Sequence, residues 1–471
     1  MSFELTTLGE YISIQGGYAY KSQQFIENST YPVLKIKNIR TGYVDFNDCA
    51  YIDKKVADET ERYIVSEGDI LISLTGSGPN APQSLVGRVA RFWNKEKRAW
   101  INQRVGRIVL KKDKTVHKDF IFYFLGTNES QNYLVANSSG SANQANINGA
   151  IIEALPFPQI DYSTSAKISQ VLRTFDEKIN LNNQINQTLE SIVQAIFKSW
   201  FIDFEPVRAK ILAKQEGKDS KLAAMCAISG KSEAELEQMS SDDFAELQAT
   251  AALFPDELMD SEFGEVPKGW EVSMVGEQVQ TVGGGTPSTK NADFWDNGIH
   301  YWTTPKDLSN LTDKILLNTE RKITDAGLKK ISSGLLPKDT VLMSSRAPVG
   351  YLALSKIEVA INQGYIAILP NMKYSAEYLI QWCKANMAEI KGRASGTTFQ
   401  EISKKNFREI SFVCPYYKVV DAYTKMVKTL YDEITLKAKE NQSLINLRDT
   451  LLPKLLSGEI SLNKNKGSIH D

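Results

Sequence analysis

Apolar side chains recur at helical spacing along two long stretches of the chain. Residues 163–204 contain neither Gly nor Pro, and a second stretch of the same kind begins near residue 420. Such spacing places one apolar seam along each helix, and about 40 residues at 1.5 Å each give a rod of roughly 60 Å. The seams are formed by Ile168, Phe175, Leu189 and Ile196 with Leu172, Ile179, Val193 and Trp200, and by Val420, Val427, Ile434 and Leu455 with Tyr423, Leu430, Leu444 and Leu451.

The two rods are predicted to pack on each other, because a small domain cannot cover a seam of that length. Four polar residues interrupt the seams at mid-rod, and we interpret them as devices that fix the register at a cost in stability. They are Asn182, Asn186, Lys437 and Asn441. The alternative is that each amphipathic helix packs into a separate core. Pro453 is expected to kink or end the second helix near Leu452.

Short β-branched runs outside the rods predict strands, and Gly and Asn punctuate them. Helices are expected among these strands at 119–125 and 376–387. The globular parts are therefore predicted to be mainly β, with a few helices. The predicted strand runs are 31–39, 70–74, 104–110, 341–344 and 360–369.

The sequence repeats itself once. A series of short motifs returns in the same order about 260 residues later, a period far too long for a solenoid. We therefore expect two copies of one module, each a globular part followed by a helical tail. The paired motifs are Gly16-Gly17 with Gly283-Gly284, Val86-Gly87 with Val349-Gly350, Asn102-Gln103 with Asn362-Gln363, 140–144 with 396–400, and Asn186-Gln187 with Asn441-Gln442.

Together these patterns predict an α+β fold with an internal pseudo-two-fold. Two similar β-rich globular domains, at 1–160 and 269–416, are separated by two long antiparallel helices packed on each other. The helical regions are expected at 161–213 and 417–460. A connector at 214–268 lies between the two modules, with short helices at 233–239 and 242–251.

The net charge of −1 conceals an asymmetry. Residues 216–265 hold 13 Asp and Glu but only 3 Lys and Arg, whereas residues 84–118 hold 11 Lys and Arg but only two acidic residues. The plain interpretation is a set of solvated faces. The alternative is that the basic part binds a polyanion such as a nucleic acid.

Sequence motifs for catalysis or metal binding are missing. Gly230-Lys231-Ser232 resembles the end of a phosphate-binding loop, but Met225 occupies the place of the first Gly, so the motif fails. The three histidines are isolated, and Cys49, Cys226, Cys383 and Cys414 form no C-x-x-C pair. We expect reduced thiols, no metal site and no active site.

The expected location is the cytoplasm. No apolar run approaches the roughly 18 residues of a membrane span, and the first residues lack the cationic and apolar regions of a secretion signal.

Candidate nucleic-acid contacts are basic residues and hydroxyls near Gly turns. Guanidinium groups suit phosphates and the O6/N7 edge of guanine, and Ser and Thr near a turn position phosphates. For any one of these residues the alternative is an ordinary surface charge, and Trp295 and Trp302 are interpreted as core rather than stacking platforms. The predicted contacts are Lys21, Arg88, Arg91, Arg104, Arg107, Thr286, Ser288, Lys290, Lys306, Arg346 and Arg393.

Several further motifs are specific in combination. They are Gly284-Gly285-Thr286-Pro287-Ser288, the Asn-Gln pair in each module, Ala252-Leu253-Phe254-Pro255 and 267–270 (Pro-Lys-Gly-Trp). With these motifs the chain resembles, over nearly its whole length, the specificity subunit of type I restriction–modification systems. The resemblance implies two target recognition domains, each reading one half of a split DNA sequence in the major groove, and two helical regions that act as spacer.

The resemblance also implies partners. Two modification (methyltransferase) subunits would dock on the helices, and two restriction (motor–nuclease) subunits would complete a complex on double-stranded DNA, without a membrane. No cofactor is expected in this chain, because S-adenosylmethionine, ATP and Mg²⁺ would be held by the partners. The predicted docking residues are Phe175, Ile179, Leu189, Ile196, Val427, Ile434, Leu444 and Leu451.

Two other classes of function stay open at this point. One is a stand-alone enzyme that modifies or cleaves DNA through an unrecognised site. The other is a coiled-coil scaffold that binds only protein.

Overall fold

The computed structural model describes residues 3–78, 86–111, 115–141, 144–262, 264–309, 311–396, 400–460 and 462. Parts of the basic stretch 84–118 and of the repeated motifs at 140–144 and 396–400 lie outside these residues. By its contacts the chain divides into two units, one formed by Met1–Lys178 with Ser443–Asp471 and the other by Ile179–Gln442. Each unit contains one β-rich head and a portion of both long helices.

The N-terminal head, residues 3–160, is built on two five-stranded sheets. The first has the order β2-β12-β8-β10-β5, antiparallel except for the parallel pair β10 and β5. Its strands are β2 (Ile12–Gly16), β12 (Val105–Leu110), β8 (Ile70–Ser73), β10 (Val89–Arg91) and β5 (Gly42–Tyr43). The second has the order β3-β6-β4-β11-β7, with strands β3 (Phe25–Ile26), β6 (Ala50–Ile52), β4 (Tyr31–Leu34), β11 (Ala99–Ile101) and β7 (Ile64–Val65).

Smaller elements complete this head. A short strand near the N-terminus pairs with the last strand before the long helix, and this closes the module. These two strands are β1 (Leu5–Thr7) and β15 (Pro156–Pro158); the others are β9 (Thr75–Gly76), β13 (Ser139–Ser141), β14 (Gln144–Asn146), α1 (Lys54–Glu59), α2 (Lys118–Leu125), α3 (Asn128–Ala136) and α4 (Gly149–Glu153).

The C-terminal head, residues 269–416, repeats this architecture. Its main sheet has the order β19-β26-β23-β24-β21, again antiparallel except for the last, parallel pair. A second sheet, β22-β20-β25, corresponds to β6-β4-β11, and β18 pairs with β27 as β1 pairs with β15. The strands are β18 (Glu271–Met274), β19 (Gln280–Val282), β20 (His300–Thr303), β21 (Ile315–Leu316), β22 (Arg321–Ile323), β23 (Val341–Ser344), β24 (Leu352–Ser355), β25 (Ala360–Ile361), β26 (Tyr365–Leu369) and β27 (Ser411–Cys414).

The helices of the C-terminal head occupy matching places. An amphipathic helix follows the main sheet in both heads, as the periodicity predicts at 119–125 and 376–387. The identical strand order of the two main sheets shows that the sequence repeat is a structural duplication, although the second sheet has five strands in one head and three in the other. The predicted α+β class is confirmed. The helices here are α10 (Val275–Gln278), α11 (Pro305–Ser309), α12 (Asp325–Leu328), α13 (Ala376–Ala385), α14 (Met387–Gly392) and α15 (Lys404–Arg408).

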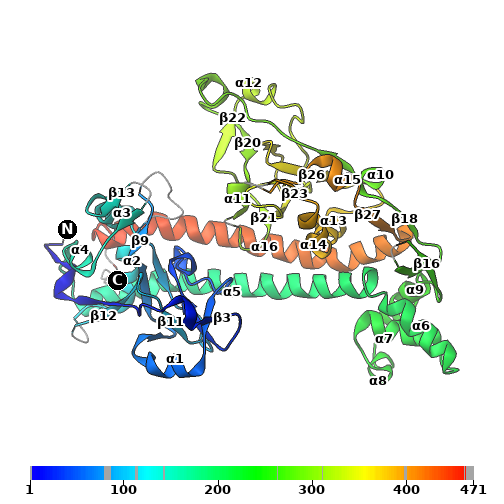
Figure 1. Ribbon diagram of the computed structural model, residues 1–471, viewed down its shortest axis with the longest axis horizontal. Coiled ribbons are helices and arrows are strands. Elements are labelled where there is room, and N and C mark those ends of the chain that lie inside the picture. The colour runs from blue at the N-terminus through cyan, green and yellow to red at the C-terminus, as the bar shows by residue number, and fades with distance from the viewer. Residues whose placement is uncertain are drawn as a thin grey trace, which may run out of the picture. The chain divides into compact units, whose positions relative to one another are not determined.

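The long helices are α5 (Tyr162–Phe201) and α16 (Tyr417–Leu456), and they lie side by side (Figure 1). In the second unit Asn182 Nδ2 donates to Asn441 Oδ1 at 2.9 Å, and Asn186 Nδ2 donates to the Ile434 carbonyl at 3.2 Å. A later residue of α5 thus contacts an earlier residue of α16, so the two helices are antiparallel. The predicted packing of one rod on the other is confirmed.

The ends of both helices belong to the cores of the heads. In the first unit Leu172 and Leu455 join a core with Phe120 and Phe157. In the second unit Phe197, Trp200 and Phe201 of α5 pack with Tyr423 of α16 and with Tyr378 of the C-terminal head. Burying rings of this size from three elements stabilises the attachment of each head to its helices.

Pro453 does not end the second helix. The helix continues to Leu456, and the Ser457 N–H donates to the Pro453 carbonyl at 2.9 Å. Proline removes only one N–H donor, and Leu455 and Leu456 are buried in the core of the first unit, which offsets that loss. The prediction that the helix ends near Leu452 is therefore wrong, and the alternative, a kink there, stays a prediction.

The connector folds into a small helical subdomain followed by a hairpin. Phe204 adopts a left-handed conformation, with φ of 54°, and separates α5 from the next helix. The predicted helices at 233–239 and 242–251 are found, the first ending at Leu236. The helix before them, α7, was not predicted, whereas α6 lies almost wholly in the helical region expected at 161–213. The elements are α6 (Glu205–Gln215), α7 (Ser220–Ser229), α8 (Glu233–Leu236), α9 (Ser241–Ala252), β16 (Leu258–Ser261) and β17 (Gly264–Pro267). Among the described residues, no helix has the length and apolar character needed to cross a bilayer.

Candidate nucleic-acid interface

The repeated motifs meet at one turn in each head. The Asn-Gln pairs directly follow β11 and β25, and a glycine passes against each turn. A Cβ on Gly17 would lie 2.3 Å from the Asn102 carbonyl oxygen, and one on Gly284 would lie 1.9 Å from that of Ile361. Only glycine allows backbone contact this close. The repeated Gly and Asn-Gln motifs are therefore one structural unit, which builds the same turn twice.

In the C-terminal head the turn carries an exposed polar loop. Thr286 Oγ1 donates to Gln363 Oε1 at 2.5 Å, and the Ser288 carbonyl accepts from Trp295 Nε1 at 3.0 Å. Thr286, Ser288 and Lys290 are all exposed. The structure thus gathers three of the predicted contacts on one surface, with hydroxyls and an ammonium group of the kind that position phosphates.

The N-terminal head presents a smaller basic set near its corresponding turn. Lys21 and Arg104 are exposed, and Arg104 Nη1 donates to Thr75 Oγ1 at 3.0 Å. Arg107 is half-buried, donates to Gln15 Oε1 at 3.1 Å and lies 3.8 Å from Asp69. Lys21 and Arg104 therefore have more accessible charge than Arg107.

Arg88 and Arg91 are not surface residues. Arg88 is 8% exposed and donates to the Ile36 and Ile39 carbonyls at 2.9 Å, and burial lowers the pKa of its guanidinium. Arg91 is 5% exposed and pairs with Asp119. Both guanidinium groups serve the fold, so the structure does not support the predicted DNA contacts at these two positions.

Lys306, Arg346 and Arg393 lie in surface ion pairs. Their carboxylate partners are Glu320 at 2.7 Å, Glu401 at 3.8 Å and Glu389 at 2.8 Å, in that order. Exposed pairs of this kind contribute only about 0–1 kcal/mol, so a phosphate can replace the carboxylate at little cost. Contact with DNA at these residues stays a prediction.

Comparison with known proteins identifies the family. A family model described as the type I restriction modification DNA specificity domain matches residues 2–191 and 267–446.

The chain belongs to this family.

Each match covers one head and most of the long helix that follows it, so the family domain occurs twice. The specificity subunit of the HindI type I restriction enzyme from Haemophilus influenzae is 34% identical over 359 residues, which cover 73% of this chain and 77% of that protein. The MjaIX specificity subunit from Methanocaldococcus jannaschii is 34% identical over 190 residues, 40% of this chain and 44% of that protein. The crystal structure of a type I S subunit from M. genitalium aligns at 16% identity over 97% of this chain and 96% of that one, with a TM-score of 0.48.

The chain is thus a type I DNA specificity subunit, and specificity subunits are non-catalytic components of a multisubunit complex that acts on DNA. The family match leaves out residues 192–266, which include the whole helical subdomain of the connector.

The predicted docking residues of this specificity subunit lie mostly in the seam. Val427 and Ile434 are buried in the core of the second unit, and Leu189 and Ile196 pack against it, while Leu451 packs against that of the first. The structure does not support docking through Val427 or Ile434, because their side chains are already covered. Phe175, Ile179 and Leu444 are half-buried. Other apolar residues of the helices face solvent: Leu181, Ile192, Leu436 and Leu447, each 43–56% exposed.

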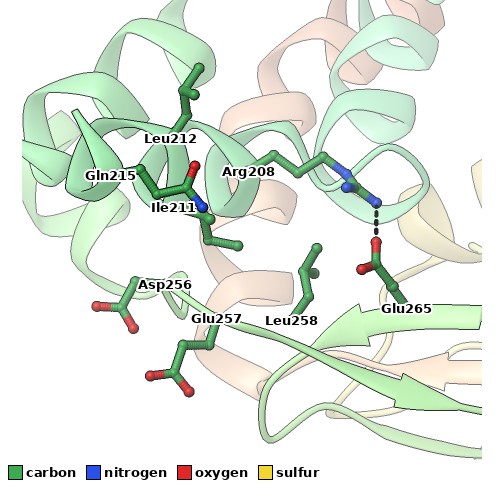
Figure 2. Close-up of a pocket in the computed structure, with 8 residues that line it drawn as sticks. All are labelled: Arg208, Ile211, Leu212, Gln215, Asp256, Glu257, Leu258 and Glu265. Carbon is green, nitrogen blue, oxygen red and sulfur yellow. Dashed lines mark hydrogen bonds and ion pairs between the residues drawn. The ribbon is translucent and has the colours of Figure 1, made fainter.

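The connector also contains a groove. It lies between α6 and the β16–β17 hairpin, and Figure 2 shows Leu258 between Glu257 and Glu265, with Leu212 pointing away from the carboxylates. Arg208 Nη2 pairs with Glu265 at 3.1 Å, and Asp256 and Glu257 also line the groove. Asp256 and Glu257 in turn pair with Lys214 and Lys268, so each carboxylate of the groove has a cationic partner.

Proposed function

We propose that each head of this specificity subunit reads one half of a bipartite DNA sequence. The observation behind this proposal is the duplicated frame, in which the same strand order and the same glycine-supported turn occur twice. Two heads with the same sheet and the same turn are expected to bind DNA in the same way. The loops on the frame differ in sequence, with 17–21 reading Gly-Tyr-Ala-Tyr-Lys and 284–288 reading Gly-Gly-Thr-Pro-Ser, which supports different half-sites.

The helix pair, α5 with α16, sets the spacing between the two half-sites in this proposal. Asn182 and Asn441 are 0% and 6% exposed and hydrogen-bond across the seam. A buried polar pair penalises any slipped register, because a shift would leave amide groups without partners. A fixed register is the property that a spacer needs.

Two modification subunits dock on the exposed apolar positions of this pair, Leu181, Ile192, Leu436 and Leu447, in the proposed complex. Two restriction subunits complete it, in the cytoplasm. S-adenosylmethionine belongs to the modification subunits, and ATP and Mg²⁺ belong to the restriction subunits. In this complex the specificity subunit contributes recognition of the DNA sequence and no catalysis.

The test is methylation of a random-sequence DNA library by the specificity subunit co-purified with its modification subunits and supplied with S-adenosylmethionine. Sequencing that detects methylated bases should return one bipartite motif with a fixed, unread spacer. The same chain without modification subunits should methylate nothing. A contiguous motif, or methylation by the chain alone, would contradict the proposal.

A further inference from the structure

The second sheet of the C-terminal head carries an aromatic platform, in which half-buried Trp295 packs against Trp302, a core residue that is 3% exposed. The Trp295 and Trp302 rings lie 4.9 Å apart at 85°. Trp302 Nε1 donates to the Gly285 carbonyl at 3.2 Å and Trp295 Nε1 to that of Ser288 at 3.0 Å. Both indoles are thereby fixed to the loop that holds the predicted DNA contacts, at the end of the head where β20, β22 and α12 lie (Figure 1).

Arg321 lies on this platform. It faces Trp302 across the β20–β22 ladder, and its guanidinium carbon is 3.6 Å from the centre of the Trp295 ring and 5.7 Å from that of Trp302. The side chain is exposed. Across the part of the chain that the structure describes, no carboxylate forms an ion pair with Arg321. Stacking on Trp295 orients the Arg321 guanidinium, and no carboxylate among the described residues occupies its N–H donors.

An oriented, exposed guanidinium suits a base edge. Its fork of N–H donors matches the O6 and N7 acceptors of guanine in the major groove, and stacking on an indole reduces the rotamer entropy lost on binding. A phosphate contact needs charge but no such orientation. The adjacent Lys322 provides a charge of that simpler kind, with its Nζ 4.5 Å from the centre of the Tyr301 ring.

The duplicated frame shows what stands at this place in the other head. Trp302 pairs with Arg321 and Ala360 in the C-terminal head, and Val33 pairs with Ala50 and Trp100 in the N-terminal head. Trp302 and Val33 therefore occupy equivalent positions, and their partners on the neighbouring strand, Arg321 and Ala50, are equivalent as well. The frame is common to both heads, while this side chain is not, as expected for a residue that distinguishes one half-site from the other.

We propose that Arg321 reads a guanine in the half-site of the C-terminal head. The inference rests on the proposed function of the heads and adds a residue and a base to it. Neither the basic stretch nor the glycine motifs of the sequence point to Arg321.

The test compares wild-type, Arg321→Ala and Arg321→Gln subunits, each co-purified with the modification subunits, in methylation of the random-sequence library. The wild-type motif should contain a guanine that both variants no longer require, with discrimination at that one position falling roughly 10- to 100-fold. The other half-site and the spacer should be unchanged. Lys322→Ala is the matched control, and it should lower methylation of all sites without changing the motif.

Two results would overturn the inference. One is an unchanged motif in both Arg321 variants, and the other is a uniform loss of methylation that matches Lys322→Ala. Either result leaves the bipartite wild-type motif, and with it the proposed function, in place. A wild-type complex without a bipartite motif would instead overturn the proposed function itself.

Discussion

Asp176 of α5 pairs with Arg448 of α16, with Arg448 Nη1 2.6 Å from Asp176 Oδ1. The other oxygen of the same carboxylate accepts from the Tyr123 hydroxyl of α2 at 2.7 Å. Asp176 is 7% exposed. One buried carboxylate therefore joins both long helices to the N-terminal head within the first unit.

Asp176→Ala should destabilise the chain by about 2–4 kcal/mol, because it leaves the buried Tyr123 hydroxyl without its acceptor and the partly buried Arg448 guanidinium with Asp449 as its remaining carboxylate partner. Chemical denaturation of the purified chain measures the change. The control is Asp421→Ala, which removes an exposed i, i+4 pair with Lys425 at 3.0 Å and should cost less than about 0.5 kcal/mol. Equal losses in the two variants would contradict the role assigned to Asp176.

The buried amides of the helix pair should be coupled. Asn182→Leu or Asn441→Leu alone removes the hydrogen bond that the two amides share and leaves only the bonds of Asn182 to Glu440 or of Asn441 to Asn183. Each single variant should cost about 1–3 kcal/mol, whereas the double variant should recover part of that loss. A double-mutant cycle by chemical denaturation gives the coupling energy, which we expect to be about 1 kcal/mol or more. Strictly additive single effects would show that the two residues act separately.

Two neighbouring glycines should respond differently to the same substitution. Gly284→Ala forces a Cβ to within 1.9 Å of the Ile361 carbonyl oxygen and should disrupt the turn that carries Thr286 and Ser288. Gly285→Ala meets nothing closer than 4.0 Å and should be tolerated. In the methylation assay, only Gly284→Ala should impair recognition of the C-terminal half-site. Similar defects in both variants would argue against the turn as the support of the loop.

The pH dependence of stability should depend partly on Glu190 of α5. Its Oε1 accepts from Lys314 Nζ at 2.7 Å and from Lys384 Nζ at 3.0 Å. Burial alone would raise the pKa of this carboxyl, but the two ammonium groups hold it below its ordinary value of 4.5. The pKa of Lys384 is lowered by burial, which outweighs the effect of Glu190 there.

A carboxyl with a depressed pKa in the folded state stabilises the fold above its ordinary pKa, and this contribution is lost as the pH falls through the folded-state value. Glu190→Gln should therefore destabilise the chain at pH 7 and flatten the decline in stability below pH 4.5. Thermal unfolding followed from pH 7 into the acid range tests this. An unchanged acid slope in Glu190→Gln would contradict it.

The periodic patterns predicted most of the fold. The seven-residue series placed α5 and α16, and the repeated Asn-Gln pairs revealed the duplication, because both signals are local and survive in a single sequence. Pro453 misled because a proline in the final turn removes only one N–H donor, while burial of Leu455 and Leu456 keeps the turn in place.

The site was predicted less well, since charge alone does not show which way a side chain faces. Arg88 and Arg91 lie in the basic stretch but point into the head. Arg321 was missed because Trp295, the ring under its guanidinium, is 26 residues earlier in the chain. The sequence Arg321-Lys322-Ile323 has no alternation that predicts a strand, and only the ladder shows that Arg321 lies opposite Trp302.

The central claim is that the two heads read DNA independently. The most direct measurement is the methylated motif of a complex whose specificity subunit carries a relative's head in place of residues 1–160, with both long helices unchanged. We predict that one half of the motif changes while the other half and the spacer length stay as in the wild type. A chimera that alters both halves together, or one that alters the spacer, would contradict the account.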